Sequence, residues 1–95
     1  MTLATTQFTP VVVGSSYANI TSSTLLKTGD GFLFGVFVAS TSSGTLKIWD
    51  QTSGATPVLV NTFSPVLGWN PIPFRFTTGL YVTVGGTIDC TFSFV

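Results

Sequence analysis

Few residues in this 95-residue chain could carry acid–base or nucleophilic chemistry. It contains no His and no Glu, and its charged side chains are three Asp and three Lys or Arg. Enzyme active sites generally depend on titratable groups whose pKa values are matched to proton transfer. A Ser or Thr nucleophile would need Lys27 or Lys47 as its base, and neither lysine lies in a recognised motif. We therefore expect that the protein is not an enzyme.

Few residues could bind a metal ion or carry out thiol chemistry. The three carboxylates, Asp30, Asp50 and Asp89, fall in different predicted turns or strands, without the loop spacing of a calcium site. The single cysteine, Cys90, can form neither an internal disulfide nor a cysteine metal site. Its alternation with Phe92 predicts a small buried hydrophobic side chain. We expect neither a bound metal nor a cofactor.

The surface that this composition predicts is neutral and rich in hydroxyl groups. Charged residues make up 6% of the chain, against roughly 25% in an ordinary soluble domain, and the formal net charge is zero. Ser and Thr together exceed a quarter of the residues. Such a surface offers no basic patch for nucleic acid or anionic lipid, and it repels neighbouring copies only weakly. We expect self-association and no nucleic-acid partner.

The apolar character of the chain raises the question of a membrane segment. The longest apolar run covers residues 32–39, far short of the roughly 20 residues that span a bilayer as a helix. Residues 1–7 lack both a basic start and an apolar stretch of signal length. We expect neither a membrane span nor an export signal.

Strand-forming and turn-forming residues dominate the chain, whereas helix-forming residues are sparse. Turn clusters recur about every ten residues, which predicts one all-β domain. Its expected form is a single antiparallel β-sandwich, jelly-roll-like, with about eight short strands. Gly85 and Gly86 are expected to form a two-residue hairpin turn between the last two strands. The predicted strands cover residues 8–13, 18–26, 32–39, 45–50, 58–63, 73–76, 80–84 and 87–95.

Three segments do not fit an ordinary half-exposed strand. Residues 32–39 are apolar on both alternating faces, so one face requires a cover, either a loop of the same chain or another subunit. Residues 64–73 contain three prolines and Trp69, and are predicted to form a stiff apolar loop. Residues 1–10 are rich in Thr and end at a proline. We predict an extended arm there, ahead of one domain that covers residues 11–95.

The two tryptophans are the side chains best suited to contact a partner. Trp49 alternates with Thr45 and Lys47, which places it on the polar face of its predicted strand. An exposed tryptophan serves either as an anchor that a partner covers or as a platform for a ligand. Trp69 has the same two interpretations, and it could also fold back to close one end of the domain.

Two stretches of the chain combine strand-forming and turn-forming residues in a recognisable order. One is LLKTGDGFLFGVFV at residues 25–38, followed by GTLKIWD at residues 44–50, and the other is FRFTTGLYVTVGGT at residues 74–87. These stretches resemble small structural proteins of tailed phages. The resemblance spans residues 25–95 and is a pattern of strands and turns without a catalytic signature. It implies a β-rich virion component similar to the capsid decoration (cement) proteins of tailed phages, including cyanophages, which are often trimeric.

A protein of this kind needs complementary surfaces and no chemistry. The resemblance implies a subunit made in the host cytoplasm that forms homotrimers and binds the major capsid protein on the virion surface. We predict subunit contacts through the loop at residues 66–74 and the second face of residues 32–39, and shell contacts through the arm. The residues predicted for subunit contacts are Phe37, Trp49, Leu67, Trp69, Ile72 and Phe74. Those predicted for the shell are Thr2, Leu3, Thr5 and Phe8.

Two other functions stay open at this point. One is a glycan- or receptor-binding module of a phage fibre, in which Trp49, Trp69 and Tyr81 would be stacking platforms. Glycan sites usually also present several acids or amides around such rings, and this chain has few. The other is a different accessory structural protein of the phage head or tail.

Overall fold

The computed structural model describes residues 15–95, and every regular element in this part of the chain is a β-strand. The predicted arm and the strand predicted at residues 8–13 lie outside the described residues. Within residues 15–95 there is no helix long and apolar enough to cross a membrane. The strands are β1 (Ser16–Ile20), β2 (Thr24–Thr28), β3 (Gly31–Trp49), β4 (Val58–Phe63), β5 (Gly68–Phe76) and β6 (Gly79–Phe94).

Two long strands, β3 and β6, organise the whole sheet. They pair with each other along nearly their full length, from Leu33 opposite Phe94 to Trp49 opposite Tyr81. β6 also pairs with β1 and β2, and β3 also pairs with β5 and β4. The result is one six-stranded antiparallel sheet, in which each of the four short strands pairs with a single long strand.

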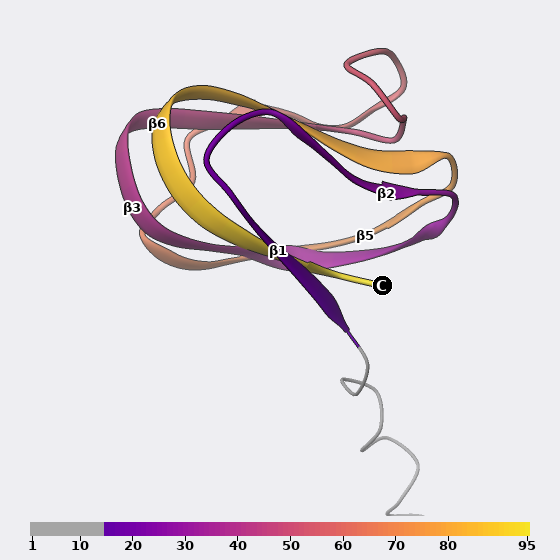
Figure 1. Ribbon diagram of the computed structural model, residues 1–95, viewed down its shortest axis with the longest axis horizontal. Coiled ribbons are helices and arrows are strands. Elements are labelled where there is room, and N and C mark those ends of the chain that lie inside the picture. Colours follow the sequence, from indigo (N-terminus) through magenta and orange to yellow (C-terminus); the bar gives the residue numbers. More distant parts are fainter. Residues whose placement is uncertain (1–14) are drawn as a thin grey trace, which may run out of the picture.

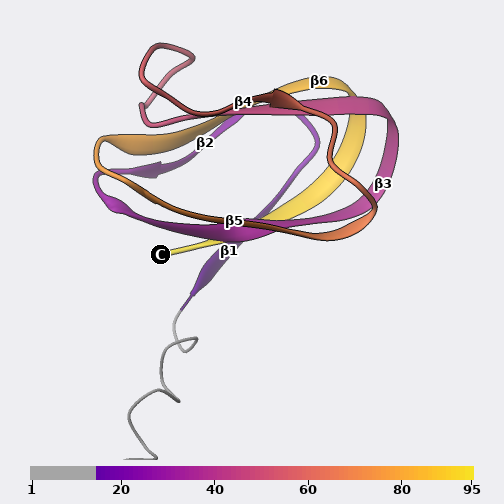
Figure 2. The ribbon, with the colours of Figure 1, turned by 180° about the vertical axis from the view of Figure 1, so that it is seen from behind.

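Both long strands bend together, and this bend shapes the molecule. β1 and β5 pair with the second half of β6 and the first half of β3, whereas β2 and β4 pair with the other two halves. Figures 1 and 2 show the two long ribbons turning back on themselves, so that the two halves of the sheet face each other. The sheet therefore encloses its core by coiling along its length.

The bend forms where Gly86 of β6 meets Ser43 of β3. The β3–β6 register shifts between Ser42 and Thr45, and both Ser43 (φ 56°) and Gly86 (φ 67°) have a left-handed backbone. A Cβ atom on Gly86 would collide with the carbonyl oxygen of Ser43. Position 86 therefore requires glycine for two reasons: its φ is positive, and the two backbones approach each other closely there.

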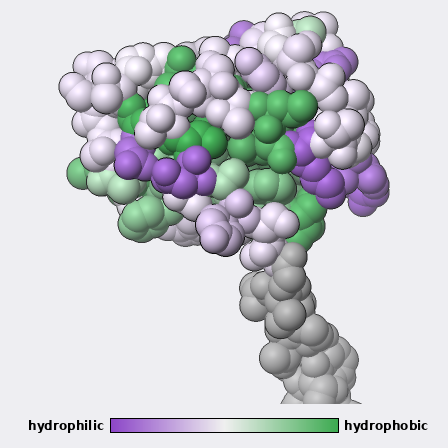
Figure 3. Space-filling view, in the orientation of Figure 1, coloured by the Kyte–Doolittle hydropathy of each residue, from purple (hydrophilic) through white to green (hydrophobic). Residues whose placement is uncertain are grey.

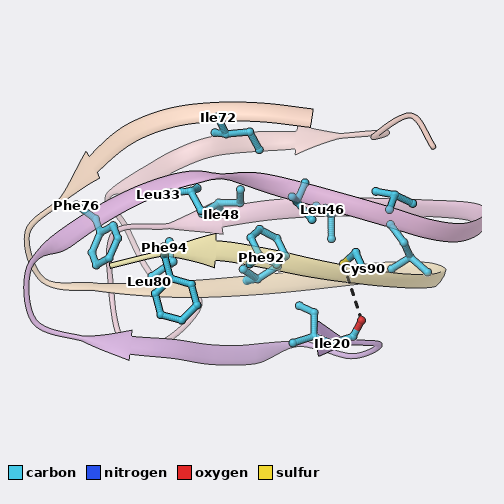
Figure 4. Close-up of a cluster of buried hydrophobic side chains, with 14 residues drawn as sticks. Ile20, Leu33, Leu46, Ile48, Ile72, Phe76, Leu80, Cys90, Phe92 and Phe94 are labelled. Carbon is cyan, nitrogen blue, oxygen red and sulfur yellow. Dashed lines mark hydrogen bonds between the residues drawn. The ribbon is translucent and has the colours of Figure 1, made fainter. Parts of the chain in front are cut away.

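The core lies between the two halves of the sheet. Val36 and Val38 reach it from the first half of β3, and Leu46 and Ile48 reach it from the second half. Figure 4 shows the side chains of this cluster in the space between the strands. No polar or charged side chain is buried within residues 15–95. The buried hydrophobic residues are Ile20, Leu33, Val36, Val38, Leu46, Ile48, Ile72, Phe76, Leu80, Val82, Ile88, Cys90, Phe92 and Phe94.

The strand predictions succeed for the all-β class and for several elements, but the bounds differ. Residues 58–63 form β4 as predicted. The strand predicted at residues 18–26 is wrong as a single element, because residues 21–23 separate β1 from β2. At this break Thr24 Oγ1 donates to the Ser22 carbonyl at 2.7 Å, and Ser23 Oγ accepts from Val84 N at 2.9 Å. The break lets the chain pass from one half of β6 to the other.

The hairpin predicted at Gly85 and Gly86 is wrong. β6 continues from Gly79 to Phe94 without a turn, and the two strands predicted at residues 32–39 and 45–50 are likewise one strand, β3. A glycine pair between alternating strands suits a tight hairpin, but its positive φ equally suits a bend within a strand. Here the bend is present because β3 and β6 pair on both sides of it.

The stiff loop predicted at residues 64–73 is only partly a loop. β5 begins at Gly68 and includes both Pro71 and Pro73. Proline removes a backbone N–H donor, which an edge strand tolerates because one of its sides has no strand to bond. β5 pairs with β3 alone, so it provides such an edge.

Candidate interaction surface

The exposed apolar side chains gather at β4, β5 and the segment that joins them. Residues 15–95 contain nine large hydrophobic side chains that are exposed, and five of these lie here. They are Val58, Val66, Leu67, Trp69 and Phe74. A hollow of about 400 Å³, the β4–β5 hollow, lies beside them and is lined by eight residues, seven of them apolar. Its lining residues are Val60, Phe63, Val66, Trp69, Asn70, Pro71, Ile72 and Phe74.

Asn70 holds the exposed turn that carries Val66 and Leu67. Its amide nitrogen donates to the carbonyls of Val66 at 2.9 Å and Gly68 at 3.0 Å, and its amide oxygen accepts from Val66 N at 3.0 Å. Val66 and Leu67 are each 65% exposed. A turn fixed in this way presents its apolar side chains without a further loss of backbone freedom on binding. Sequence reasoning missed Asn70, although an Asn near a glycine is a frequent turn signal.

A second apolar surface lies on the outer face of β3 and β5. Phe37 and Trp69 are cross-strand partners and are 51% and 50% exposed. Next to them is a hollow of about 440 Å³, the Trp69 hollow, which lies on this face and whose described lining residues carry no charge. Its lining residues are Ser15, Phe34, Trp69, Pro71 and Ser93.

Residues 32–39 present apolar side chains on both faces, but these do not follow a strict period of two. The register between β3 and its neighbours shifts between Leu33 and Gly35. As a result Leu33 and Val36 are both buried although they are three residues apart, and Phe37 is exposed. A bulge of this kind moves every later side chain to the opposite face, which a strict period of two cannot reveal.

Trp49 lies on the face predicted for it, but its own chain covers much of it. It is half-buried, and its Nε1 donates to Thr83 Oγ1 at 2.9 Å. The Lys47 ammonium lies 4.3 Å from the centre of the indole ring, and Tyr81 is the cross-strand partner. Trp69 pairs with the other half of β3. The structure therefore does not gather the three predicted stacking rings into one platform.

Apart from the half-buried Trp49, the predicted contact residues fall into three groups. Phe37, Leu67, Trp69 and Phe74 are exposed. Ile72 is 6% exposed and belongs to the core, and it also lines the β4–β5 hollow, so a partner could reach it only through that hollow. Ile72 and Phe76 lie four residues apart on β5 and therefore on the same face of the strand, and both are buried because this face is turned toward the core. The residues predicted for the shell, Thr2, Leu3, Thr5 and Phe8, lie outside the described residues.

The Asp50 carboxylate closes the turn between β5 and β6. It accepts hydrogen bonds from the backbone N–H groups of Thr77, Thr78 and Gly79, at 2.8–3.3 Å, and from the Thr77 hydroxyl at 3.1 Å. Burial raises the pKa of Asp50, but these hydrogen bonds to the charged form outweigh it, and the pKa lies below its ordinary value of 3.8. Asp50 is therefore a structural clamp.

The other two carboxylates have separate partners. Asp30 lies 3.8 Å from Arg75 in an ion pair whose side chains are both 73% exposed. Asp89 accepts from the Asn19 amide at 2.8 Å. Cys90 is fully buried, as predicted, and burial, together with the negative charge of Asp89, raises the pKa of its thiol to about 11. Among residues 15–95, no charged side chain lines either hollow.

The opposite side of the molecule also carries apolar residues. Figure 3 shows hydrophobic residues in the middle of the side on which β1 and β2 lie, with hydrophilic residues to the left and right. Leu25 of β2 is 41% exposed there. The named hollows, however, both involve β5.

Comparison of the chain with protein families, with curated proteins and with solved structures finds no match. The geometry itself supplies apolar, uncharged surfaces on a rigid scaffold. Surfaces of that kind are suited to packing against another protein surface.

Proposed function

We propose that this protein is a structural subunit that works by assembly, as a capsid decoration (cement) protein that forms homotrimers on the head of a tailed phage. One observation carries the proposal: exposed apolar side chains cluster at β4 and β5 in a chain of which only 6% is charged. Permanent protein interfaces are more apolar than transient ones and resemble a domain core cut in half. The sequence resemblance to decoration proteins supports the virion role.

The subunit contact in this proposal uses the β4–β5 hollow and the side chains around it. Leu67 projects from the turn held by Asn70, and Phe74 lies at the hollow with 48% of its surface exposed. An apolar side chain from a neighbouring copy would fill the hollow without desolvating any charge. Tryptophan is enriched among interface hot spots, so Trp69 is the expected anchor.

A ring of three copies suits a capsid lattice. Head-to-tail contacts close into a ring when the rotation between copies permits it, and a threefold ring matches the local threefold points of a shell. In this proposal the arm at residues 1–10 binds the major capsid protein, with Thr2, Leu3, Thr5 and Phe8 in contact with it. An arm of this kind can add a strand to the edge of a sheet.

The proposal also treats the fold as a jelly-roll-like sandwich. The two halves of each long strand would act as separate strands of two facing layers. Together with the four short strands they make eight, the number of a jelly roll, and the segment predicted at residues 8–13 would be a ninth.

The solution mass of matched variants tests the assembly surface. Leu67→Ser and Phe74→Ser remove apolar side chains at the β4–β5 hollow, and Leu25→Ser removes one of similar exposure from β2. We expect light scattering to give a monomer mass for the first two variants and the wild-type oligomer mass for Leu25→Ser. An oligomer that survives both β4–β5 substitutions would exclude this surface.

Shell binding is tested separately from assembly. Deletion of residues 1–9 should leave the trimer intact and abolish binding to capsids that lack the protein. A truncated protein that still decorates shells at full occupancy would refute the role of the arm. Absence of the chain from purified phage heads by mass spectrometry would refute the capsid role and leave the assembly surface standing.

A further inference from the structure

The turn between β2 and β3 contains the only step in the sequence at which an Asp or Asn residue is followed by Gly. This step is Asp30–Gly31, whereas the other two aspartates precede Gln51 and Cys90. Because glycine has no side chain, its amide nitrogen can approach the carboxyl group of the residue before it with little steric hindrance. Attack of this nitrogen on the side chain is the first step of aspartate isomerisation, so Asp30 has the sequence context that favours this reaction.

The fold restrains the Asp30 carboxylate less than it restrains the other two. Asp30 forms an ion pair with Arg75 at 3.8 Å, and both side chains are 73% exposed. An ion pair so exposed to water holds its side chains only weakly. In contrast, Asp50 accepts hydrogen bonds from three backbone N–H groups, and Asp89 accepts one from the Asn19 amide at 2.8 Å. The Asp30 carboxyl group can therefore turn toward its own backbone.

The backbone around Asp30 has open space before this residue and close packing after it. Gly29 has a φ of 93°, and a Cβ atom there would meet nothing within 4 Å. Gly31 is the first residue of β3, so it lies at the end of the ladder with β5. A Cβ atom at position 31 would collide with the carbonyl oxygen of Val95 and would come within 2.6 Å of Phe76 Cζ. The packing therefore requires glycine after Asp30, and the turn leaves room for a ring.

We propose that Asp30 is a site of spontaneous isoaspartate formation in the folded protein. The Gly31 amide nitrogen attacks Cγ of Asp30, and one water molecule leaves to give a cyclic succinimide. Water then adds to the main-chain carbonyl carbon of Asp30, and the bond from this carbon to the Gly31 nitrogen breaks. The chain now runs through Cγ and is longer by one carbon, and the former main-chain carbonyl is a carboxylate. The reaction takes up and releases only water, so it needs no oxidant or other reagent.

The added carbon should weaken the start of β3. Phe32 N donates to the Val95 carbonyl at 3.0 Å, and Val95 N donates to the Phe32 carbonyl at 2.9 Å. Phe76, which lies against Gly31, is fully buried in the core. Gly31 is already in close contact with both neighbours, so a longer backbone before it cannot be accommodated on that side. We expect isomerised protein to have a lower Tm than the fresh protein.

This inference is independent of the proposed assembly. Asp30 and Gly31 line neither the β4–β5 hollow nor the Trp69 hollow. The readout is a chemical change in the chain and not its mass in solution. Failure of the inference would leave the assembly proposal unchanged, and a monomeric protein would leave the inference unchanged.

Mass spectrometry of aged full-length protein tests the proposal. Native and urea-unfolded samples are incubated side by side at neutral pH and digested, and isoaspartate is located by electron-transfer fragmentation, which distinguishes the two linkages. In the native sample the isoaspartate content at Asp30 should rise with time, while Asp50 and Asp89 stay at background. Isoaspartate at Asp30 in the unfolded sample alone would overturn the proposal, because the fold would then block the reaction. Absence from both samples would overturn it as well.

Two variants at position 30 bracket the wild-type behaviour. Asp30→Glu keeps the negative charge near Arg75 but would have to close a six-membered ring, which forms much more slowly. It should accumulate no modified product, and its Tm should stay constant while that of the wild type falls. Asp30→Asn forms the same succinimide faster, with loss of ammonia, so its stability is measured on fresh protein. An equal fall of Tm in Asp30→Glu and wild type would contradict the predicted effect on β3.

Discussion

The indole ring of Trp69 lies directly on the backbone of Gly35. A Cβ atom at position 35 would come within 2.7 Å of Trp69 Cη2 and would collide with the carbonyl oxygen of Asn70. The absence of a side chain at Gly35 therefore lets the aromatic ring approach β3 closely, with Phe37 as its cross-strand neighbour. Trp69 is the more exposed of the two tryptophans, and its position depends on the absence of a side chain at Gly35.

Gly35→Ala should destabilise the fold and displace Trp69. Overpacking of a close contact costs about 1–3 kcal/mol, and here the added methyl group meets backbone as well as the ring. The free energy of unfolding, measured by urea denaturation with circular dichroism, should fall by this amount. Gly54→Ala is the control, because its Cβ would have only ordinary contacts at 3.8–3.9 Å. Equal stabilities of the two variants would contradict the account of Gly35.

Asp50→Asn should weaken the clamp on the turn at residues 77–79. The carboxylate accepts several hydrogen bonds there, but it is partly exposed, so we expect a loss on the order of 1–2 kcal/mol in the free energy of unfolding. Asp30→Asn is the matched control, since its ion pair with Arg75 is 73% exposed and should contribute little. An equally large loss of stability in Asp30→Asn would show that the effect comes from removing a negative charge and not from the hydrogen bonds of Asp50.

The same clamp predicts how stability depends on pH in acid. The pKa of Asp50 is lower in the folded protein than its ordinary value of 3.8, so the unfolded chain binds a proton more readily. The stabilisation is present above that value and is lost as pH falls through the lowered pKa. Wild type should therefore lose more stability than Asp50→Asn when urea denaturation is repeated below about pH 4. Parallel pH curves would mean that Asp50 does not titrate in this way.

Gly86→Ala should disturb the bend more than a substitution at another glycine with positive φ. Gly86 and Gly29 have φ values of 67° and 93°, but only at Gly86 would a Cβ atom meet another backbone. Backbone strain alone costs of order 1–3 kcal/mol, so Gly29→Ala measures that strain and Gly86→Ala measures strain plus collision. Thermal unfolding should give a lower Tm for Gly86→Ala. A similar Tm for both variants would show that the contact between position 86 and the Ser43 backbone does not affect stability.

Cys90 should be protected in the folded protein. It is fully buried and burial raises the pKa of its thiol to about 11, so the reactive thiolate is scarce at neutral pH. We expect no alkylation by iodoacetamide in the native state and complete alkylation in urea, measured by mass spectrometry. Between the ordinary value of 9.0 and about 11 the unfolded thiol ionises first, so stability should fall as pH rises through this range. Rapid native labelling would contradict the burial of Cys90.

Local patterns in the sequence predict the strands better than they predict how the strands connect. Alternation of Cys90 with Phe92 correctly places both in the core. The bulge after Leu33, the break at residues 21–23 and the bend at Gly86 are not visible in such patterns, because each depends on a partner strand far away in the sequence. Turn-forming residues therefore mark points of irregularity correctly, but pairing across the sheet decides whether the chain turns or bends.

The candidate surface could likewise be predicted only in part from the sequence. An exposed Leu67, Trp69 and Phe74 could be predicted, since apolar residues among prolines cannot all enter a small core. Burial of Ile72 required knowledge that the segment is an edge strand with one inward face. The hydrogen bonds of Asn70 and the cover over Trp49 required the folded chain.

The mass of the wild-type protein in solution tests the central claim most directly. Light scattering over a range of concentrations should give roughly 30 kDa, three copies of the 10.0 kDa chain, and dilution should not readily dissociate it. A stable monomer of 10.0 kDa at every concentration would contradict assembly through the β4–β5 surface.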